Sequence, residues 1–325
     1  MTLYILRRIL QSAFVALAMS MIVFVGLNVV GNPVDILMPA DASQQDIADA
    51  VARLGLDRPL HEQYVVFLKN ALTGNLGISF VNGQSALATV LERLPATLEL
   101  AVVAMILALF IGIPLGFLAG LRPNSLPAKA IMSSSIVAFS LPTFWIGIVF
   151  IMLFAVQLGW LPSGGRGLTR SILGLELSVL TLDGLKHILL PALTLSLFKI
   201  ALIIRLTAAE TVEVSGQDYV KFARAKGVRR GRITYVHILK NVILPVMTVS
   251  AMEFGNIIAF SVVTETVYSW PGMGKLLIDA IRMVDRPVVV AYLIVCVLIF
   301  MVLNLIVDIV YSILDPRISL KSESA

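Results

Sequence analysis

Six apolar stretches of this chain are each long enough to cross a lipid bilayer as a helix. A bilayer core about 30 Å thick requires about 20 mostly apolar residues, because a helix rises about 1.5 Å per residue. The six stretches are Ile9–Val30, Leu98–Ala119, Ile131–Leu158, Ile188–Leu206, Val242–Val267 and Val288–Leu314. Charged residues make up 14% of the chain, against about 25% in a soluble domain. We therefore expect an all-α integral membrane protein with six transmembrane helices.

The basic residues predict how the chain crosses the membrane. Lys and Arg are retained preferentially on the cytoplasmic side. If the amino terminus is inside, Arg7, Arg8 and the dense basic run Lys221–Arg232 all lie on the inner side. The A-x-A sequence at Ala16–Ala18 resembles a signal-peptide cleavage site, but the apolar run continues to Val30, which indicates an uncleaved anchor. Both termini are therefore expected to be cytoplasmic.

The segment between the first two apolar stretches predicts a small extracytoplasmic helical segment. Ser43 is a suitable cap for a helix that stops at Gly55, and Pro59 is a suitable start for a second helix that ends at Thr73–Asn75. We divide the chain into an amino-terminal cytoplasmic segment with the first transmembrane helix (1–30), an extracytoplasmic cap (31–97), and a membrane core with five helices and a cytoplasmic loop at 209–243 (98–325). The cap can serve as a lid, as a dock for another protein or as a spacer.

A polar, strongly basic stretch begins at Gln217, between the fourth and fifth apolar stretches. Four of its residues recur at helical spacing: Tyr219, Phe222, Ala223 and Lys226. Gly227 can take the left-handed conformation that ends such a helix. The aromatic and small residues could enter a groove of a partner protein, with the basic residues fixing the orientation. The alternative is a basic loop near anionic lipid headgroups, but the ordered pattern favours a docking helix.

Polar residues inside the apolar stretches are candidates for function, because ionisable groups are costly in a membrane. Lys199, Glu253, Asn304 and Asp308 lie in these stretches, and each could line a polar path. Lys199 could instead extend its amine toward the interface, and Asp308 could pair with Arg205 as a structural contact. Glu253 is the strongest candidate because it lies near the middle of its stretch. Three prolines can bend these helices: Pro114, Pro142 and Pro191.

The sequence contains no catalytic constellation and no metal-binding pattern. The phosphate-binding pattern G-x-x-x-x-G-K-[ST] is missing, since Gly274–Lys275 lacks the upstream glycine and is followed by Leu276. The histidines His61, His187 and His237 are scattered, and H-E-x-x-H fails at its last position after His61. We therefore expect neither a catalytic residue nor a metal ligand.

Seven short motifs follow one another in a characteristic order. They are LRRIL at Leu6–Leu10, GLDRPL at Gly55–Leu60, LPATLEL at Leu94–Leu100, WLPSG at Trp160–Gly164, ARAKG at Ala223–Gly227, ETVYSWPGMG at Glu265–Gly274 and LDPRI at Leu314–Ile318. Along nearly its whole length the chain therefore resembles the permeases of dipeptide, oligopeptide and nickel ABC importers. The general loop pattern of such permeases is E-A-A, then three residues and G, with I-x-L-P later, and Ala223 and Gly227 match it. Lys221 stands at the Glu position and Pro245 lies farther from the glycine, which resembles the peptide branch.

The resemblance implies a type I ABC-importer permease fold and assigns roles to two segments. The residues that would contact an ATPase are Tyr219, Phe222, Ala223, Arg224, Ala225, Lys226, Gly227 and Pro245. The residues that would form a loop at the external mouth of the path are Glu265, Trp270, Pro271, Gly272 and Gly274. From the residues alone, Tyr268 and Trp270 could equally be anchors at the membrane interface.

The resemblance also implies partners in the cytoplasmic membrane of a bacterium. These are a second, homologous permease in a heterodimer, two ATP-binding subunits, an extracytoplasmic solute-binding protein and the lipid bilayer, with no nucleic acid. ATP and Mg²⁺ would be bound by partner subunits, so the chain would be a transport subunit without a cofactor, not an enzyme. Peptide is the first expected solute and a nickel chelate the second. The rival classes are an ion-driven secondary transporter, which would show inverted repeats, and an intramembrane protease, which would show paired aspartates or a serine with a histidine.

Overall fold

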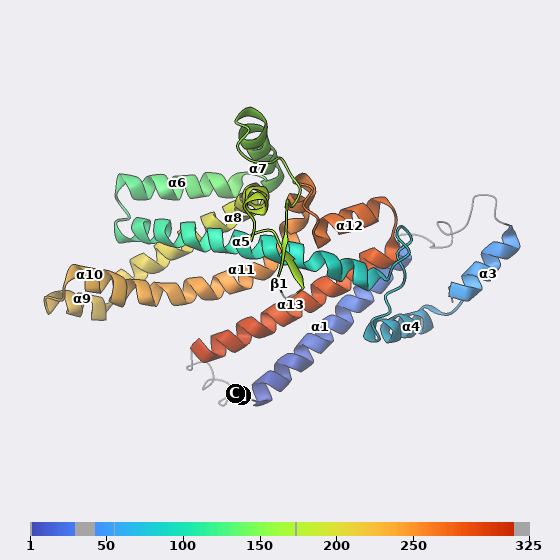
Figure 1. Cartoon of the computed structure of the whole chain (residues 1–325). Helices are drawn as coiled ribbons and strands as arrows, with labels where there is room; N and C mark the ends of the chain where they lie inside the picture. The colour runs from blue at the N-terminus through green and yellow to red at the C-terminus, as the bar shows by residue number, and fades with distance from the viewer. Residues whose placement is uncertain (1, 30–42, 55, 173, 315–325) are drawn as a thin grey trace. The chain divides into compact units, whose positions relative to one another are not determined.

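The computed structural model describes residues 2–29, 43–54, 56–172 and 174–314, and most of this part is helical (Figure 1). Contacts divide the chain into two units. The first contains Met1–Arg93, Leu276–Ile306 and Ser312–Ala325, and the second contains Leu94–Lys275 and Val307–Tyr311.

The first unit holds the amino-terminal helices and most of the last one. Its elements are α1 (Thr2–Val29), α3 (Gln44–Leu54), α4 (Leu60–Leu72), the start of α5 (Ala86–Leu121), most of α12 (Met273–Arg282) and most of α13 (Arg286–Leu314). The two helices expected in the cap are confirmed. Ser43 Oγ accepts from the Asp46 amide at 3.2 Å and the Ser43 amide donates to the Asp46 carboxylate at 3.2 Å, a reciprocal helix cap. Helix α4 follows Pro59 and ends at Leu72, with Thr73 as its carboxyl-terminal cap, while the expected stop at Gly55 lies outside the described residues.

Aromatic contacts hold α4 against α1. The Tyr64 ring lies 5.4 Å and the Phe67 ring 5.7 Å from the ring of Phe24. The hydroxyls of Ser20 and Tyr64 share a hydrogen bond of 2.9 Å. Helix α4 is therefore fixed to α1, which suits a segment too small to have a stable core of its own.

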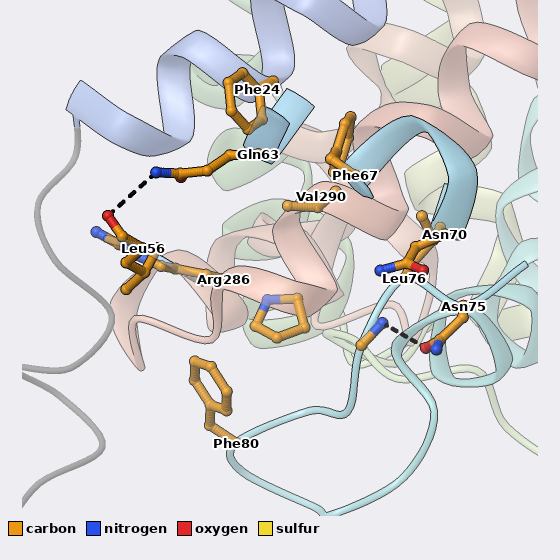
Figure 2. Close-up of a pocket in the computed structure, with 12 residues that line it drawn as sticks. Phe24, Leu56, Gln63, Phe67, Asn70, Asn75, Leu76, Phe80, Arg286 and Val290 are labelled. Atoms are coloured by element: carbon orange, nitrogen blue, oxygen red, sulfur yellow. Dashed lines mark hydrogen bonds between the residues drawn. The ribbon is translucent and has the colours of Figure 1, made fainter. Parts of the chain in front are cut away.

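A cavity of about 460 Å³ lies beside α4 in this unit (Figure 2). It is lined by Phe24, Leu56, Gln63, Phe67, Asn70, Asn75, Leu76, Gly77, Phe80, Arg286, Pro287 and Val290. The Gln63 amide donates to the Leu56 carbonyl at 3.2 Å, and the Asn75 side chain accepts from the Gly77 amide at 3.4 Å. Aromatic rings and amide groups thus share the walls.

The second unit is built on three long helices. Its elements are the rest of α5, then α6 (Leu126–Ser140), α7 (Thr143–Phe150), the π-helix η1 (Ile151–Gln157), the strands β1 (Arg170–Ile172) and β2 (Leu175–Leu177), α8 (Leu182–Ser215), α9 (Asp218–Ala225), α10 (Arg230–Arg232), the π-helix η2 (Ile233–Leu239) and α11 (Lys240–Val267). The strands form an antiparallel hairpin in which Ile172 pairs with Leu175. The stretch expected as a cytoplasmic loop, 209–243, is more helical than expected. Helix α8 continues to Ser215, and the next long helix already begins at Arg230.

Four helices within the described residues are long and apolar enough to cross a membrane. They are Ala86–Leu121, Leu182–Ser215, Arg230–Val267 and Arg286–Ile306, and a bent pair could form a fifth span. The first expected span lies in α1, whose described apolar part is Phe14–Gly26.

The third expected span is not one continuous helix. Helix α6 and the α7–η1 segment are bent by 102° relative to each other, at the position where Pro142 was expected to bend the span Ile131–Leu158. Leu141, at the break, has φ −87° and ψ 135°, the extended conformation that a residue before proline prefers. Pro142 also has no amide hydrogen to donate. Pro114 and Pro191, by contrast, lie inside continuous helices.

Glycines let α5 and α8 approach closely. Gly112, Gly116 and Gly120 are spaced four apart, so they lie on one face of α5. A Cβ at Gly116 would lie 2.5 Å from the Ile204 carbonyl oxygen, and one at Gly120 would lie 2.6 Å from that of Ala208. Both distances are well below van der Waals contact, so the helices pack backbone to backbone along this seam.

Candidate functional site

Helix α9 presents an apolar face inward and an aromatic face outward. Val220 is fully buried and Ala223 nearly so, because both pack in a core cluster with Phe117 of α5 and Val242 of α11. Tyr219 and Phe222 are 44% and 60% exposed. Of the residues expected to enter a partner, Tyr219 and Phe222 are exposed, whereas Ala223 is buried within the chain.

The end of α9 has the geometry that the sequence predicts. Gly227 has φ +72°, and its amide donates to the Arg224 carbonyl at 3.0 Å. The Val228 amide reaches back to the Ala223 carbonyl at 3.1 Å, which completes a Schellman motif. A Cβ at Gly227 would meet no atom within 4 Å, so glycine is needed for its backbone conformation and not for space.

Basic side chains surround the outer face of α9. Those that are exposed are Lys221, Arg224, Lys226, Arg229, Arg230 and Arg232, and Ala225 is exposed among them. The Lys226 amine lies 4.5 Å from the centre of the Phe222 ring, and Lys221 pairs with Asp218 at 3.0 Å. Pro245 is not part of this surface, because it lies inside α11. The result is an aromatic patch inside a basic rim, suited to an acidic groove.

Two of the expected path residues contact each other. The Lys199 amine of α8 forms an ion pair with the Glu253 carboxylate of α11, and the Asn256 amide donates to the same carboxylate at 3.2 Å. The side chain of Lys199 is 9% exposed and that of Glu253 is 24% exposed. Lys199 therefore does not extend toward an interface, because its charge is neutralised within the span.

The other two expected path residues lie on α13. Asn304 is exposed, and Asp308 lies in the helix with a side chain outside the described part. The guanidinium of Arg205, the partner suggested for Asp308, lies 4.3 Å from the centre of the Phe139 ring.

The motif ETVYSWPGMG is organised around the buried carboxylate of Glu265. Glu265 accepts from Thr97 Oγ1 at 2.8 Å, from Ser261 Oγ at 2.9 Å and from the Lys275 amide at 3.0 Å. A Cβ at Gly272 would lie 2.5 Å from the carboxylate carbon of Glu265, so only glycine fits there. The carboxylate thus binds α5 and the first turn of α12 to the end of α11.

The aromatic residues of this motif are not membrane-interface anchors. Trp270 is fully buried and its indole donates to the Ala96 carbonyl at 2.9 Å. Tyr268 is also buried, and its hydroxyl donates to the Gly147 carbonyl at 3.1 Å. Burial raises the pKa of this hydroxyl above its usual range. Pro271 precedes α12 and Gly274 lies in its first turn, where a Cβ would be 2.6 Å from the Val262 Cα.

Sequence reasoning missed a second buried carboxylate, Glu99 in the motif LPATLEL. It pairs with Arg166 at 2.7 Å and accepts from the amides of Ser178 and Val179 at 2.6 and 2.9 Å. Glu99 therefore ties the loop that carries the β1–β2 hairpin to α5. An acidic residue at the start of an apolar stretch is the signal that could have identified it.

Comparisons with known proteins place these features in a family. Residues 112–320 match the family described as "Binding-protein-dependent transport system inner membrane component". Residues 1–101 match a second model, "Binding-prot-dependent transport system membrane comp, N-term".

Two relatives with assigned names match most of the chain. The di/tripeptide transport system permease protein DppB of Pseudomonas aeruginosa is 39% identical over 302 residues, 89% of this chain and 90% of that protein. The oligopeptide transport system permease protein AppB of Bacillus subtilis is 37% identical over 320 residues, 98% of this chain and 99% of that protein.

A solved structure shares the fold. A chain of the MetNI methionine ABC transporter, in inward-facing conformations, matches with a TM-score of 0.52 at 17% identity, over 68% of this chain and 94% of that chain. The expected fold, that of an ABC transporter permease, is thereby confirmed.

Proposed function

The chain belongs to the family of binding-protein-dependent transport system inner membrane components, and on this basis we propose that it is one permease subunit of an ATP-driven importer of short peptides. The observation that carries the proposal is its identity of 37–39% to a di/tripeptide and an oligopeptide permease over most of its length. The aromatic patch of α9 and the intramembrane ion pair support it, because a permease needs both a contact for an energy-supplying subunit and a polar path.

Helix α9 is the docking element for an ATPase in this proposal. Phe222 and Tyr219 enter an apolar groove of the ATPase, and the basic rim around them sets the orientation. Because Val220 and Ala223 pack on α5 and α11, a displacement of α9 moves these helices with it. ATP and Mg²⁺ are bound by the ATPase pair, and this chain binds neither.

The remaining partners follow from the same proposal. A second, homologous permease completes the path, and a solute-binding protein delivers peptide from outside. Both termini and α9 lie in the cytoplasm. The helices α3 and α4 and the turn around Glu265 then lie on the outer side, where they contribute to the dock for the binding protein.

The test is to isolate the tagged chain from its own membrane with its partners and to measure uptake into proteoliposomes. We expect an ATPase and a second permease to co-purify, and a labelled dipeptide to accumulate only with ATP and binding protein. Uptake of a nickel chelate without uptake of peptide would show that the transported solute is the chelate and not a peptide. Isolation of the chain alone, with uptake driven by an ion gradient, would defeat the proposal.

A further inference from the structure

The ion pair between Lys199 and Glu253 has an unusual position. It joins the middle parts of α8 and α11, two of the helices long enough to span a membrane. Asn256 donates to one oxygen of Glu253, and the Lys199 amine lies 5.3 Å from the centre of the Phe198 ring. The pair therefore has a cation, an anion and a neutral donor within one small site.

The pair is only partly enclosed. About a quarter of the Glu253 side chain is exposed in this chain, whereas most of Lys199 is covered. An ionised carboxylate at this depth is unfavourable against hydrocarbon. The face of α11 that bears Glu253 must therefore meet water or protein and not lipid.

A short peptide carries the complementary charges. Its free ends are an ammonium and a carboxylate, and these ends are common to all short peptides whatever their side chains. The ammonium can take the place of Lys199 at Glu253, and the carboxylate can take the place of Glu253 at Lys199. Charged hydrogen bonds are stronger than neutral ones, so each exchange preserves a strong contact.

We propose that Lys199 and Glu253 form an exchangeable pair that binds the two charged ends of a zwitterionic peptide as it crosses the membrane. This inference rests on the proposed function. Without peptide the residues neutralise each other, so no uncompensated charge remains within the span. When a peptide is bound, only its two ends are recognised, so the pair does not select among peptide side chains.

The experiment measures occupancy next to the pair. Phe260 lies seven residues after Glu253, on the same face of α11, and is exposed. Phe260→Cys in a Cys296→Ser background gives the purified importer complex a thiol whose labelling by a water-soluble reagent can be timed. Dipeptide is added directly, without binding protein, so that selection by that protein plays no part.

With the pair intact, we expect the dipeptide to slow labelling by about tenfold, and both its N-acetyl form and its C-terminal amide to protect less. Lys199→Met together with Glu253→Gln keeps similar side-chain sizes and should abolish the protection. If this double variant fails to assemble, the blocked peptides on the intact pair still decide the question.

Two results would overturn the inference. Equal protection by free and blocked peptides would show that the pair does not recognise the charged ends of the peptide. A thiol at position 260 that never reacts would show that this face of α11 does not line an aqueous path. Uptake of dipeptide by the unaltered complex is measured first, because its absence would defeat the proposed function and not this inference alone.

Discussion

At Gly272 the turn before α12 has no room for a side chain. The nearest group is the buried carboxylate of Glu265, which already accepts three hydrogen bonds from other parts of the same unit. The motif thus requires a carboxylate at position 265 and glycine at position 272, because the carboxylate fills the space that a side chain at 272 would need.

We expect Gly272→Ala to destabilise the protein, because the added methyl group displaces Glu265 from its donors. Loss of a buried hydrogen bond costs about 1–3 kcal/mol. The measurement is the thermal unfolding midpoint in detergent. Gly231→Ala is the matched control, since a Cβ there meets nothing within 4 Å. Equal midpoints for the two variants would contradict this account of the turn.

At Gly227 a substitution changes both the backbone energy and the local charge. We expect Gly227→Asp to leave the protein in the membrane but to reduce recovery of the ATPase in pull-downs, because it places a negative charge at the basic end of α9 and a side chain at φ +72°.

Gly227→Asn is the matched control, since Asn and Asp both tolerate this conformation and only Asp adds a charge. We expect it to recover more ATPase than Gly227→Asp. If Gly227→Asp recovers as much ATPase as the unaltered chain, the docking role of this end of α9 is refuted.

At the scale of elements, α9 separates stability from docking. Phe222 is exposed and Val220 is fully buried on the opposite face. We expect Phe222→Ala to weaken ATPase recovery at least about fivefold with an unchanged unfolding midpoint, because exposed aromatic residues are common centres of binding energy. Val220→Ala should lower the midpoint instead. A lowered midpoint for Phe222→Ala would place that ring in the core and not at an interface.

The seam between α5 and α8 makes a second prediction about elements. Gly116→Ala adds a methyl group against the Ile204 carbonyl and should force the helices apart, at a cost of about 1–3 kcal/mol. Val102→Ile adds a methyl group at an exposed position of the same helix and serves as the control. The thermal unfolding midpoint is measured for both variants. An unchanged midpoint for Gly116→Ala would show that α5 and α8 pack less closely than described.

Local sequence signals predicted local structure well. Ser43 and Pro59 marked the starts of α3 and α4, and Gly227 marked the end of α9, because caps and left-handed positions depend on neighbouring residues. The ion pair of Lys199 with Glu253 could not be predicted, since the register between α8 and α11 depends on packing across the membrane core. The burial of Trp270 was missed for the same reason, because its partner Ala96 is distant in sequence.

At the scale of the molecule, the order of spans is testable by sidedness. One span, α8, separates the β1–β2 hairpin from α9. In a Cys296→Ser background, we expect Leu175→Cys to react with an impermeant thiol reagent only from outside and Phe222→Cys only from inside. Both side chains are exposed in this chain. Reaction of both from one side would contradict the topology.

Apolar length alone located the long spans but not their shape. Five of the six stretches fall on helices that could cross a membrane if the bent pair counts as one, and the first falls on α1. The 102° break at Leu141–Pro142 was expected only as a possible bend. A proline signals a lost amide donor, whereas the size of the bend depends on what packs around it.

The same break has a consequence for how a cell makes this protein. Carbonyl groups at an interrupted helix find no donors in lipid, so they must be covered by protein or reached by water. In the proposed assembly the second permease would help to cover them, so a copy made without it would expose the break, a defect of the kind that proteolytic quality control detects. The abundance of the assembled transporter would then follow its scarcest subunit, and surplus copies of this chain would have short lifetimes.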